Sequence, residues 1–456
     1  MPIKPATPKG TRDFSSTEVA RRNYLKQVLQ QAFETFGFQP IETPSFERLE
    51  TLTGVYGEEG DRLVFKILNS GEKIKKADTA ALADGATQKF IHSISEKALR
   101  YDLTVPFARF VAQHQNELTF PFRRYQIQPV WRADRPQHGR FQEFYQCDAD
   151  IVGIRSLWQE IEMLSLYDKV FENLGLEGVC LKINHRKILS GIAGVLGAES
   201  KLTAFTIALD KLDKIGNEGV LNELKANDFS PEALQKLQML LELKGSALEQ
   251  LNTLQEVLAD EAEGQEGIKE LRFVLKQMES TTLKSSSLQF DLSLARGLHY
   301  YTGMIVEVSA PETVTIGSIG GGGRYDDLTG TFGMKDTSGI GISFGFERIY
   351  LVLEELGLFP EILGKSTQVL FANFGDEAAS VAYSYIKKLR DLNIPCELYP
   401  TETKLKKQLT YANDKKIAQV VLIGSEELKQ NSFVLKNMDT GEQASHALST
   451  LVSMVS

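Results

Sequence analysis

Two neighbouring stretches of this sequence carry polar side chains at the spacing of β-strands. In residues 124–132, RYQIQPVWR, apolar residues alternate with arginine and glutamine; in residues 144–150, FYQCDAD, glutamine and two aspartates share one parity. Because successive strand residues point to opposite faces, we expect each stretch to have one packing face and one binding face. Guanidinium groups suit phosphate oxygens, whereas carboxylates and amides suit ammonium and N–H groups. The alternative is a solvated, charged hairpin.

Three arginines occur at positions where strands and helices begin or end. We expect Arg132 at a strand end, Arg296 before a strand and Arg348 near the start of a helix. A guanidinium is always charged and its planar fork matches phosphate oxygens, so three such groups meeting in space would bind a polyphosphate. Taken singly, each has an alternative interpretation as a surface or ion-paired arginine.

A glycine cluster, GSIGGGGRYDDL in residues 317–328, lacks the Gly-Lys-Ser/Thr of a phosphate-binding P-loop. It also lacks the short βαβ surroundings of a dinucleotide fingerprint. Four successive glycines allow a backbone to approach a flat ligand closely. The alternative is a flexible turn.

The composition limits the class of protein. The chain has 456 residues, enough for about three domains, and 51 basic against 60 acidic residues give a net charge of −9. This balance argues against a general polyanion binder, so any nucleic-acid contact must be local. Besides the hairpin, residues 403–416, TKLKKQLTYANDKK, offer such a contact through Lys404, Lys406, Lys407, Lys415 and Lys416. The alternative for that run is a solvated helix face.

The sequence also predicts where the protein works. We find no apolar run of membrane-spanning length and no apolar stretch near the N-terminus that would indicate a signal peptide. The three cysteines are widely spaced, which suits a reducing compartment, and the six histidines form no metal-binding pair. We therefore expect a cytoplasmic protein with no membrane contact and no protein-bound metal.

The elements that must position these groups follow from periodicity. Residues 18–36 predict an amphipathic helix, and the prolines of residues 36–47, FGFQPIETPSFE, predict an extended segment. A hairpin-like pair turning at residues 69–71, and then a mobile connection over residues 75–95, are expected next. Asp102 and Thr104 are expected to share a strand face before a helix that begins near Pro106.

The second half divides into a helical part and two parts with strands. Residues 190–280 are leucine-rich and charged, which predicts a helical insertion, and strand character returns from residue 288. Residues 338–356, SGIGISFGFERIYLVLEEL, predict a strand leading into a helix, and the last 90 or so residues alternate short strands with helices. The fold class is therefore α+β, with a helical insertion and a small C-terminal α/β domain.

Seven of these stretches resemble a known family. VWRADRP, GIGISFGFERIYLVLEEL and FGFQPIETPSFE are similar to the second, third and first signature motifs of class II aminoacyl-tRNA synthetases. LRYDLTVPFAR, GRFQEFYQCDADIVG, LDKLDKIG and ARGLHYYTG together resemble the histidyl-tRNA synthetase family. The resemblance extends from PKGTRDF at residue 8 to the C-terminal domain.

The resemblance implies a class II antiparallel sheet flanked by helices and a C-terminal domain like the anticodon-binding domain. The expected bounds are 1–188 for the first catalytic part, 189–284 for the insertion, 285–362 for the second catalytic part and 367–456 for the anticodon-binding domain.

The implied activity is that of a ligase: ATP activates L-histidine to histidyl-adenylate, and the histidyl group passes to the 3′ end of tRNA(His). ATP would enter with Mg²⁺ as a substrate complex, no tightly bound cofactor is expected, and the first motif implies a homodimer. The alternative is the histidine-sensing regulatory subunit of ATP phosphoribosyltransferase, which charges no tRNA. A class II synthetase for threonine or proline is a further alternative, which the RGLHYYTG stretch opposes.

The resemblance also assigns residues. Arg132 and Arg296 would be catalytic at the α-phosphate, Arg348 would hold the γ-phosphate, and Asp134 would orient ATP. Many class II enzymes have glutamate at that position. The aspartate side chain of this protein is one methylene shorter, so it reaches less far toward ATP. For histidine, the resemblance implies contacts by Asp102, Thr104, Gln146, Asp150, Arg296, Tyr300 and Tyr301.

Within the histidine set, Asp102, Thr104 and Gln146 would hold the amino end, and Asp150 and Tyr301 would read the ring. The alternative for Asp150 is a turn cap. His299 stands where the family more often has aspartate, and we expect no catalytic role for it.

Two tRNA contacts are implied. The loop RPQHGR would meet the acceptor end through Arg135, Gln137, His138 and Arg140. The C-terminal domain would read the anticodon, with phosphate charge supplying affinity and unstacked bases supplying sequence.

Overall fold

The computed structural model of the chain describes residues 3–295, 300–326, 328–361 and 367–455. The chain divides into two compact units, residues 1–13 with 22–359 and residues 14–21 with 360–456. The predicted insertion belongs to the first unit, and the expected bounds of the single domains stay predictions.

Within the described residues, eight strands form the large sheet of the first unit, in the order β1-β5-β6-β11-β10-β9-β7-β8. Neighbours are antiparallel except for the pairs β1–β5 and β7–β8, which are parallel. The strands are β1 (Gln39–Pro40), β5 (Phe122–Trp131), β6 (Glu143–Val152), β7 (Val179–His185), β8 (Ser286–Phe290), β9 (Tyr301–Ser309), β10 (Ser318–Asp326) and β11 (Ser338–Phe344).

Strands β5 and β6 form the hairpin that the alternation of residue types predicts. The polar faces lie opposite each other in register, with Arg124 against Asp150 and Gln128 against Gln146. The apolar faces pack in the other direction, where the Tyr125 ring lies 5.3 Å from that of Phe33 in helix α1 (Ser16–Thr35). The solvated-hairpin alternative is therefore wrong.

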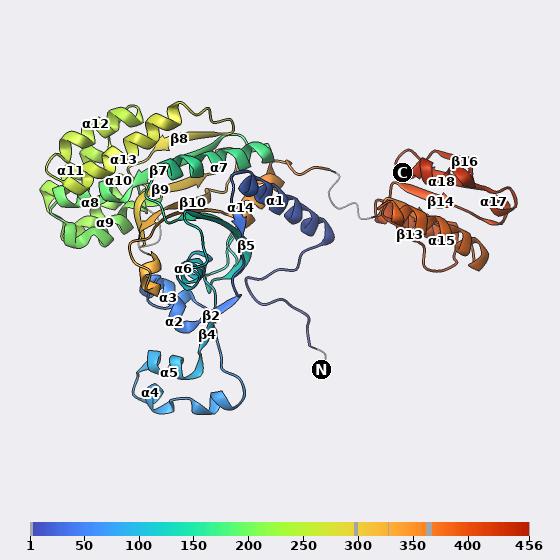
Figure 1. Ribbon diagram of the computed structural model, residues 1–456, viewed down its shortest axis with the longest axis horizontal. Helices are drawn as coiled ribbons and strands as arrows, with labels where there is room; N and C mark the ends of the chain where they lie inside the picture. The colour runs from blue at the N-terminus through green and yellow to red at the C-terminus, as the bar shows by residue number, and fades with distance from the viewer. Residues whose placement is uncertain (1–2, 296–299, 327, 362–366, 456) are drawn as a thin grey trace. The chain divides into compact units, whose positions relative to one another are not determined.

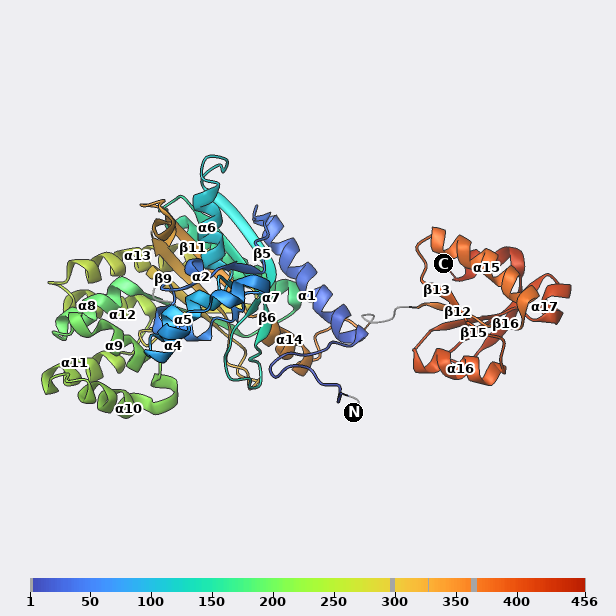
Figure 2. The ribbon, with the colours of Figure 1, turned by 90° about the horizontal axis from the view of Figure 1, so that it is seen from below.

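Helices cover both faces of the sheet. Tyr167 of α7 (Trp158–Leu174) packs on Phe344 of β11, on the face that α1 also covers through Phe33. On the opposite face, Phe107 of α6 (Thr104–Gln113) packs on Phe122 of β5. Figure 2 shows β5 between α6 and α1, and Figure 1 shows α14 (Phe346–Glu355) beside α1.

The glycine cluster is a strand and not a flexible turn. Gly320 to Gly323 lie in β10, between β9 and β11. A Cβ at Gly322 would stand 2.2 Å from the backbone oxygen of Gly341. Glycine is therefore required where the backbones approach so closely.

Residues 190–280 form helices, which gather beside β7 and β8 in Figure 1. They are α8 (Arg186–Val195), α9 (Leu202–Leu209), α10 (Leu212–Ala226), α11 (Pro231–Leu241), α12 (Ala247–Val257) and α13 (Ala262–Glu279). Helix α13 approaches α8 at two glycines, where a Cβ at Gly191 would lie 2.8 Å from the Cα of Gly264. At the base of the insertion, His185 contacts the carboxylate of Glu270 at 2.8 Å.

The expected hairpin around residues 69–71 is wrong. Helix α3 (Gly57–Leu63) comes first, and β3 (Lys66–Ile67) pairs with β4 (Lys97–Leu99), which also pairs with β2 (Phe46–Arg48). The intervening residues turn into a 3₁₀ helix (Gly71–Lys76) and the helices α4 (Thr79–Ala83) and α5 (Thr87–Ile94). The connection expected over 75–95 is therefore partly helical, and Figure 1 shows α4 and α5 projecting below β2 and β4.

The second unit contains its own sheet in the order β13-β12-β14-β15-β16 among the described residues. The first three strands are parallel and the last two run antiparallel to their neighbours. The strands are β12 (Val369–Phe371), β13 (Cys396–Leu398), β14 (Gln419–Leu422), β15 (Ser432–Asn437) and β16 (Gln443–Ala447). The helices are α15 (Asp376–Asp391), α16 (Leu405–Asp414), α17 (Ser425–Lys429) and α18 (Leu451–Val455).

Candidate active site

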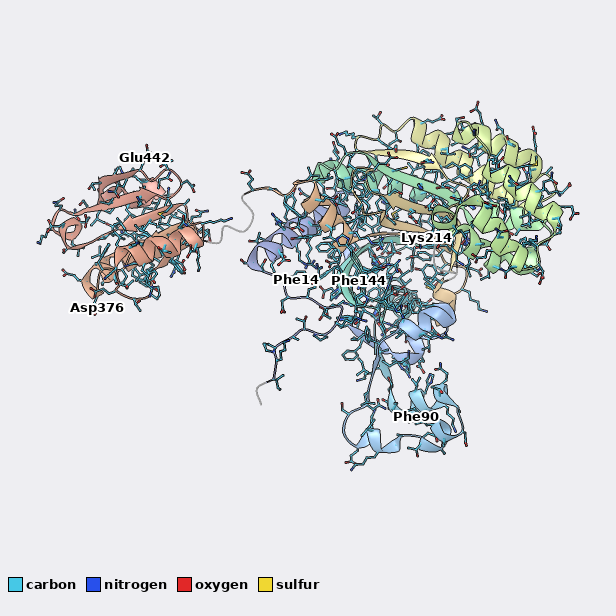
Figure 3. The ribbon with its side chains drawn as sticks, turned by 180° about the vertical axis from the view of Figure 1, so that it is seen from behind. Phe14, Phe90, Phe144, Lys214, Asp376 and Glu442 are labelled. Carbon is cyan, nitrogen blue, oxygen red and sulfur yellow. The ribbon has the colours of Figure 1, made fainter. Side chains whose placement is uncertain are left out.

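A cavity of about 410 Å³ opens in the first unit. Its walls come from β6 and the loop between β5 and β6, from β9, β10 and β11, from the start of α14 and from the segment that leads into α6. Phe144 of β6 is one of its lining residues, and Figure 3 shows this side chain in the interior of the first unit.

Residues far apart in the sequence meet around this cavity. Of the residues that the sequence analysis singled out, the lining includes Asp102, Thr104, Arg132, Asp134, Arg140, Gln146, Tyr300, Tyr301 and Arg348. Arg132 and Arg348 thus share one hollow. Arg296 and His299 lie outside the described residues.

Asp102 presents a buried carboxylate to one end of the cavity. It is 1% exposed, and its Oδ1 accepts from the Tyr56 hydroxyl at 2.7 Å and from the backbone N–H of Val105 at 3.2 Å. Its Oδ2 has no hydrogen-bond partner among the described residues. Burial raises the pKa of Asp102, whereas the Tyr56 hydrogen bond and the charge of Arg132 lower it. The site thus offers an acceptor that a cationic group can occupy.

Thr104 does not share a strand face with Asp102, contrary to the sequence analysis. Strand β4 ends at Leu99, and Thr104 is the first residue of α6. Asp102 accepts from the N–H of Val105 in the first turn, as a side chain at a helix N-terminus does. Both residues reach the cavity through this strand-to-helix connection.

Gln146 provides a second acceptor at the same end. Its side-chain Nε2 donates to Asp148 Oδ2 at 3.5 Å, while Oε1 is buried without a partner among the residues described. With Asp102 Oδ2, this amide oxygen gives the cavity two unfilled acceptors. Such a pair suits a group with several N–H donors.

Asp148 and Asp150 continue the row of acceptors on β6, at 3% and 2% exposed. Asp150 lies in register with Arg124, forms an ion pair of 2.7 Å with it and accepts from the Tyr325 hydroxyl at 2.7 Å. Burial raises the pKa of both carboxyls, that of Asp148 to about 7, and Arg124 opposes both shifts.

Asp150 does not line the main cavity. With Asp148 and Tyr325 it lines a smaller one of about 20 Å³, which shares Thr104, Tyr301 and Ser343 with the large cavity. The turn-cap alternative for Asp150 is wrong, because the residue lies within β6.

Tyr300 lines the main cavity, and Tyr301 lines both cavities. Their rings are 4.9 Å apart at 62°, and Tyr300 also lies edge-on to Tyr325 at 6.0 Å. Burial raises the pKa of Tyr300, whose hydroxyl bonds with Thr104. Both tyrosines therefore stay neutral near pH 7 and act as hydrogen-bonding groups.

The cavity also carries arginines. The Arg132 guanidinium lies 4.3 Å from the ring centre of Tyr101 and 5.2 Å from that of Phe144, and Nε donates to the Tyr101 backbone oxygen at 3.1 Å. Arg348 donates to the backbone oxygen of Ser318 at 2.6 Å. Stacking and backbone bonds hold these cations in place.

Asp134 and the loop residues lie around the mouth of the cavity. The Asp134 carboxylate is 3.8 Å from the guanidinium of Arg140. Of the four loop residues expected to contact tRNA, Arg140 lines the cavity. Arg135, Gln137 and His138 are exposed, and the backbones of Gln137 and Arg140 bond to each other at the tip.

Comparisons with known proteins decide the family. A family profile described as histidyl-tRNA synthetase matches residues 72–349, and one described as anticodon binding domain matches residues 368–456. The histidine–tRNA ligase of Christiangramia forsetii is 60% identical, covering 97% of both chains. That of Flavobacterium johnsoniae is 55% identical, covering 98% of both. The chain belongs to the histidyl-tRNA synthetase family.

Solved structures agree with this assignment. The crystal structure of a histidyl-tRNA synthetase from Nostoc sp. PCC 7120 matches with a TM-score of 0.82 at 30% identity, covering 100% of this chain and 99% of that one. A Bacillus halodurans protein described as an ATP phosphoribosyltransferase regulatory subunit/histidyl-tRNA synthetase matches with a TM-score of 0.73 at 21% identity, which shows a shared fold.

These findings confirm three predictions for this member of the histidyl-tRNA synthetase family. The fold class is α+β with an added anticodon-binding domain, the protein is an enzyme, and its class is histidine–tRNA ligase. The regulatory-subunit alternative is not favoured. In the part of the chain that the structure describes, no helix is long and apolar enough to cross a membrane, and no three His, Cys, Asp or Glu side chains group as metal ligands.

Three charged or polar groups of this synthetase site were not predicted from the sequence: Tyr56, Glu307 and Glu347. Strand period placed Arg124 and Asp148 on the predicted binding faces, but no role was assigned to either. Glu347 precedes Arg348 in the third motif. The roles of Tyr56 and Arg124 depend on contacts across the fold, which no local pattern reveals.

Proposed function

We propose that this chain joins L-histidine to ATP, releasing diphosphate, and passes the histidyl group from the adenylate to the 3′ end of tRNA(His). The observation that supports this most directly is the meeting of two kinds of polar group in one cavity. Asp102 and Gln146 offer acceptors without a partner among the described residues, and the guanidiniums of Arg132 and Arg348 line the same hollow.

The acceptor end suits the α-ammonium of an amino acid. An ammonium donates up to three hydrogen bonds, and Asp102 Oδ2, Gln146 Oε1 and the Thr104 hydroxyl line the cavity. The Tyr56 hydroxyl and the Val105 N–H hold the Asp102 carboxylate in one orientation. Binding a cation there would also favour the ionised form of this buried acid.

The ring of histidine would lie toward Tyr301 and Asp150. Asp150 is ion-paired with Arg124 and accepts a hydrogen bond from the Tyr325 hydroxyl. It would therefore act on the ring through the small cavity that it lines together with Tyr301. A site built to hydrogen-bond polar substrate atoms rejects analogues that lack them by about 10⁴ to 10⁵, so no editing domain is needed.

Arginines would stabilise the activation step. The substrate carboxylate attacks the α-phosphate in line, and negative charge develops on the phosphoryl oxygens. Arg132 would bridge the carboxylate and the α-phosphate, Arg348 would hold the γ-phosphate, and Asp134 would orient ATP. Arg296 is assigned to the α-phosphate by the family resemblance alone. Mg²⁺ would enter on the outer phosphates as part of the substrate.

Transfer to tRNA needs no strong base from the protein, because a phosphate oxygen can accept the proton of the terminal ribose hydroxyl. The exposed loop residues Arg135, Gln137 and His138, together with Arg140, would contact the acceptor end. The anticodon-binding domain exposes Lys406 and Lys407 on α16 and would supply phosphate contacts. The first motif supports a homodimer, and the unpaired thiols suit the cytoplasm.

Diphosphate exchange into ATP, measured with each of the 20 amino acids in turn, tests this proposal. Exchange should depend on histidine, and charging of tRNA(His) should follow with the same amino acid. Exchange without charging would support a protein that activates histidine but is no tRNA ligase. Absence of both would remove the proposed reaction.

A further inference from the structure

Two aspartates of β6 share the small cavity of about 20 Å³. Asp148 and Asp150 are nearly fully buried, and Tyr301 and Tyr325 line the same cavity. Asp150 fits there because its partner in register on β11 is Gly341, where a Cβ would stand 2.0 Å from Asp150 Oδ1. Two carboxylates buried in one cavity of this size cannot both be ionised without a large electrostatic cost.

One guanidinium faces this pair of acids. Arg124 of β5 is fully buried, its Nη2 lies 2.7 Å from Asp150 Oδ2, and its guanidinium lies 4.2 Å from the ring centre of Phe107. Asp150 also accepts from the Tyr325 hydroxyl at 2.7 Å through Oδ1. Among the described residues, the lining of the small cavity includes no basic side chain. One permanent positive charge, which is paired with Asp150, therefore balances one of the two acids.

Asp148 faces weaker donors than Asp150. Among the described residues its donors are neutral: the Gln146 amide lies 3.5 Å from Oδ2, and the Ser343 hydroxyl, in register on β11, also bonds to the carboxyl group. A guanidinium favours an ionised carboxylate more strongly than neutral donors do. The proton of the pair therefore belongs on Asp148. Burial raises its pKa to about 7, with Arg124 opposing the shift and Asp150 adding to it.

The other ionisable groups around Asp148 leave the proton on it. The Asp102 carboxylate adds to the rise in its pKa. The neighbouring tyrosine hydroxyls and one thiol are neutral near pH 7, because burial raises the pKa of each. These groups are Cys147 of β6, Tyr167 of α7, Tyr301 of β9 and Tyr325 of β10.

The small cavity cannot hold an imidazole ring. Its volume of about 20 Å³ suits about one water molecule. Thr104, Tyr301 and Ser343 line both cavities. A histidine ring beside Tyr301 in the main cavity would therefore reach the two acids through one bound water, and such a bridge is nearly as favourable as a direct hydrogen bond.

The proton on Asp148 decides what this water can offer to the ring. A water molecule has two hydrogens to donate. With Asp148 protonated, the water accepts from Asp148 and donates one hydrogen to Asp150, which leaves its second hydrogen for the unprotonated nitrogen of a neutral imidazole. With both acids ionised, both hydrogens point to the carboxylates, and that nitrogen loses its donor.

We propose that Asp148 is a specificity-determining residue for the amino-acid side chain: it holds a proton beside the ionised Asp150, so that the small cavity donates a hydrogen bond, through one water, to the unprotonated ring nitrogen of histidine. The inference rests on the proposed function, because it assumes that histidine occupies the main cavity. A side chain without such an acceptor would leave the hydrogen of the water unpaired and would bind more weakly.

The first test uses Asp148→Asn, because the asparagine amide is a donor at every pH. In diphosphate exchange with ATP saturating, the KM for histidine of the variant is divided by that of the unaltered protein at pH 6 and at pH 8. This ratio cancels the ionisation of histidine itself. It should fall about tenfold between the two pH values, because only the unaltered protein loses a donor as Asp148 ionises. The corresponding ratio for ATP should stay within about twofold.

Proton uptake gives a second measurement that does not depend on catalysis. Calorimetric titration with histidine, in buffers of different ionisation enthalpy, counts the protons taken up on binding. At pH 8 the unaltered protein should take up more than Asp148→Asn by up to about one proton, because bound histidine requires the protonated acid. At pH 6 the difference should nearly vanish, since Asp148 already holds its proton.

A further variant removes the donor altogether. Asp148→Leu has a similar size but no hydrogen-bonding group, so the KM for histidine should be raised at pH 6, where Asp148→Asn behaves like the unaltered protein. The matched control is Asp84→Asn, at an exposed aspartate that lines neither cavity. It should leave both KM values and the proton uptake unchanged.

A KM ratio for Asp148→Asn that is equal at the two pH values, or that rises with pH, would overturn the proposal. So would equal proton uptake at pH 8. The proposed function would fail in a different way, because the unaltered protein would then show neither histidine binding in the calorimeter nor histidine-dependent exchange.

Discussion

The carboxylates and the guanidiniums of the site hold their charges in opposite ways. Asp102 in the main cavity and Asp148 and Asp150 in the small one are nearly fully buried, and burial raises the pKa of each. Arg132 and Arg348 are partly exposed and are held by ring stacking and backbone oxygens.

The difference matches the proposed ligands. A small ammonium can be enclosed, and its acceptors are accordingly buried. Among the described residues, Asp102 Oδ2 and Gln146 Oε1 have no hydrogen-bond partner, so a bound ammonium could donate to both. A triphosphate is large and strongly hydrated, so permanently charged groups at an open wall suit it better. We therefore expect substitutions of the buried acceptors and of the arginines to affect different substrates.

Substitution of Arg132 should have the largest effect. Arg132→Met removes the guanidinium proposed at the α-phosphate, where charge develops, so the turnover in diphosphate exchange should fall by about 10² to 10³. The KM values for histidine and ATP should change much less. Arg62→Met, at an exposed arginine of α3, is the control. A fall of less than threefold would remove Arg132 from the chemistry.

Asp102→Asn should affect histidine and not ATP. The amide oxygen can still accept from Tyr56 and Val105, but an NH₂ group would replace Oδ2 and face the substrate ammonium. We expect kcat/KM for histidine to fall about 100-fold, because a charge-assisted contact is replaced by opposed donors. The KM for ATP, measured in the same exchange assay, should hardly change.

The exposed Asp84→Asn is the matched control for that experiment. Equal losses for ATP and histidine would show that the buried acceptors and the arginines do not serve different substrates.

Tyr56→Phe should give a smaller change of the same kind. It removes the hydroxyl that donates to Asp102 Oδ1 at 2.7 Å while keeping the buried ring. Loss of one hydrogen bond of about 1 kcal/mol predicts a rise of about fivefold in the KM for histidine. If the KM for ATP changed and the KM for histidine did not, the proposed role of Tyr56 in holding Asp102 for histidine would be wrong.

The pH dependence of stability should show the smallest effect. The pKa of Asp148 is raised from 3.8 to about 7, chiefly by burial, with Asp150 adding to the shift and Arg124 opposing it. The folded protein thus binds this proton more tightly than the unfolded chain does. The stability that this proton confers is present below about pH 4 and is lost as the pH rises to about 7.

Urea unfolding of Asp148→Asn at pH 5 and pH 8 measures this contribution. Both tryptophans, Trp131 and Trp158, lie in the first unit, so their fluorescence reports its unfolding. The difference in the free energy of unfolding between the two pH values should be smaller in the variant. Equal differences would show that Asp148 does not titrate in this range.

Periodicity and motif spacing predicted the elements that depend on local sequence. The alternation of residues 124–132 predicted β5, whose polar face lies in register with that of β6, and the helical insertion and C-terminal α/β unit followed from composition. The expected convergence of Arg132 and Arg348 is found in the cavity lining. The roles of the predicted site residues remain predictions.

Contacts between distant segments could not be predicted in this way. Arg12 donates to Glu347 across a separation of 335 residues, and neither stretch carries a pattern that requires the other. Thr104 looked like a strand residue because the alternation of Asp102 and Thr104 is too short to distinguish a strand end from a helix start. The partner of β3 lies beyond two helices, whereas a turn signal at residues 69–71 suggested a nearby one.

Strand β10 limits how this cavity could change during evolution or redesign. Because Gly320 to Gly322 line it with main chain, and a Cβ at Gly322 would stand 2.2 Å from the backbone oxygen of Gly341, a larger residue at Gly322 would force β10 and β11 apart. New ligand preferences would therefore have to come from the other lining residues, such as those of β6, β9 and the segment that leads into α6.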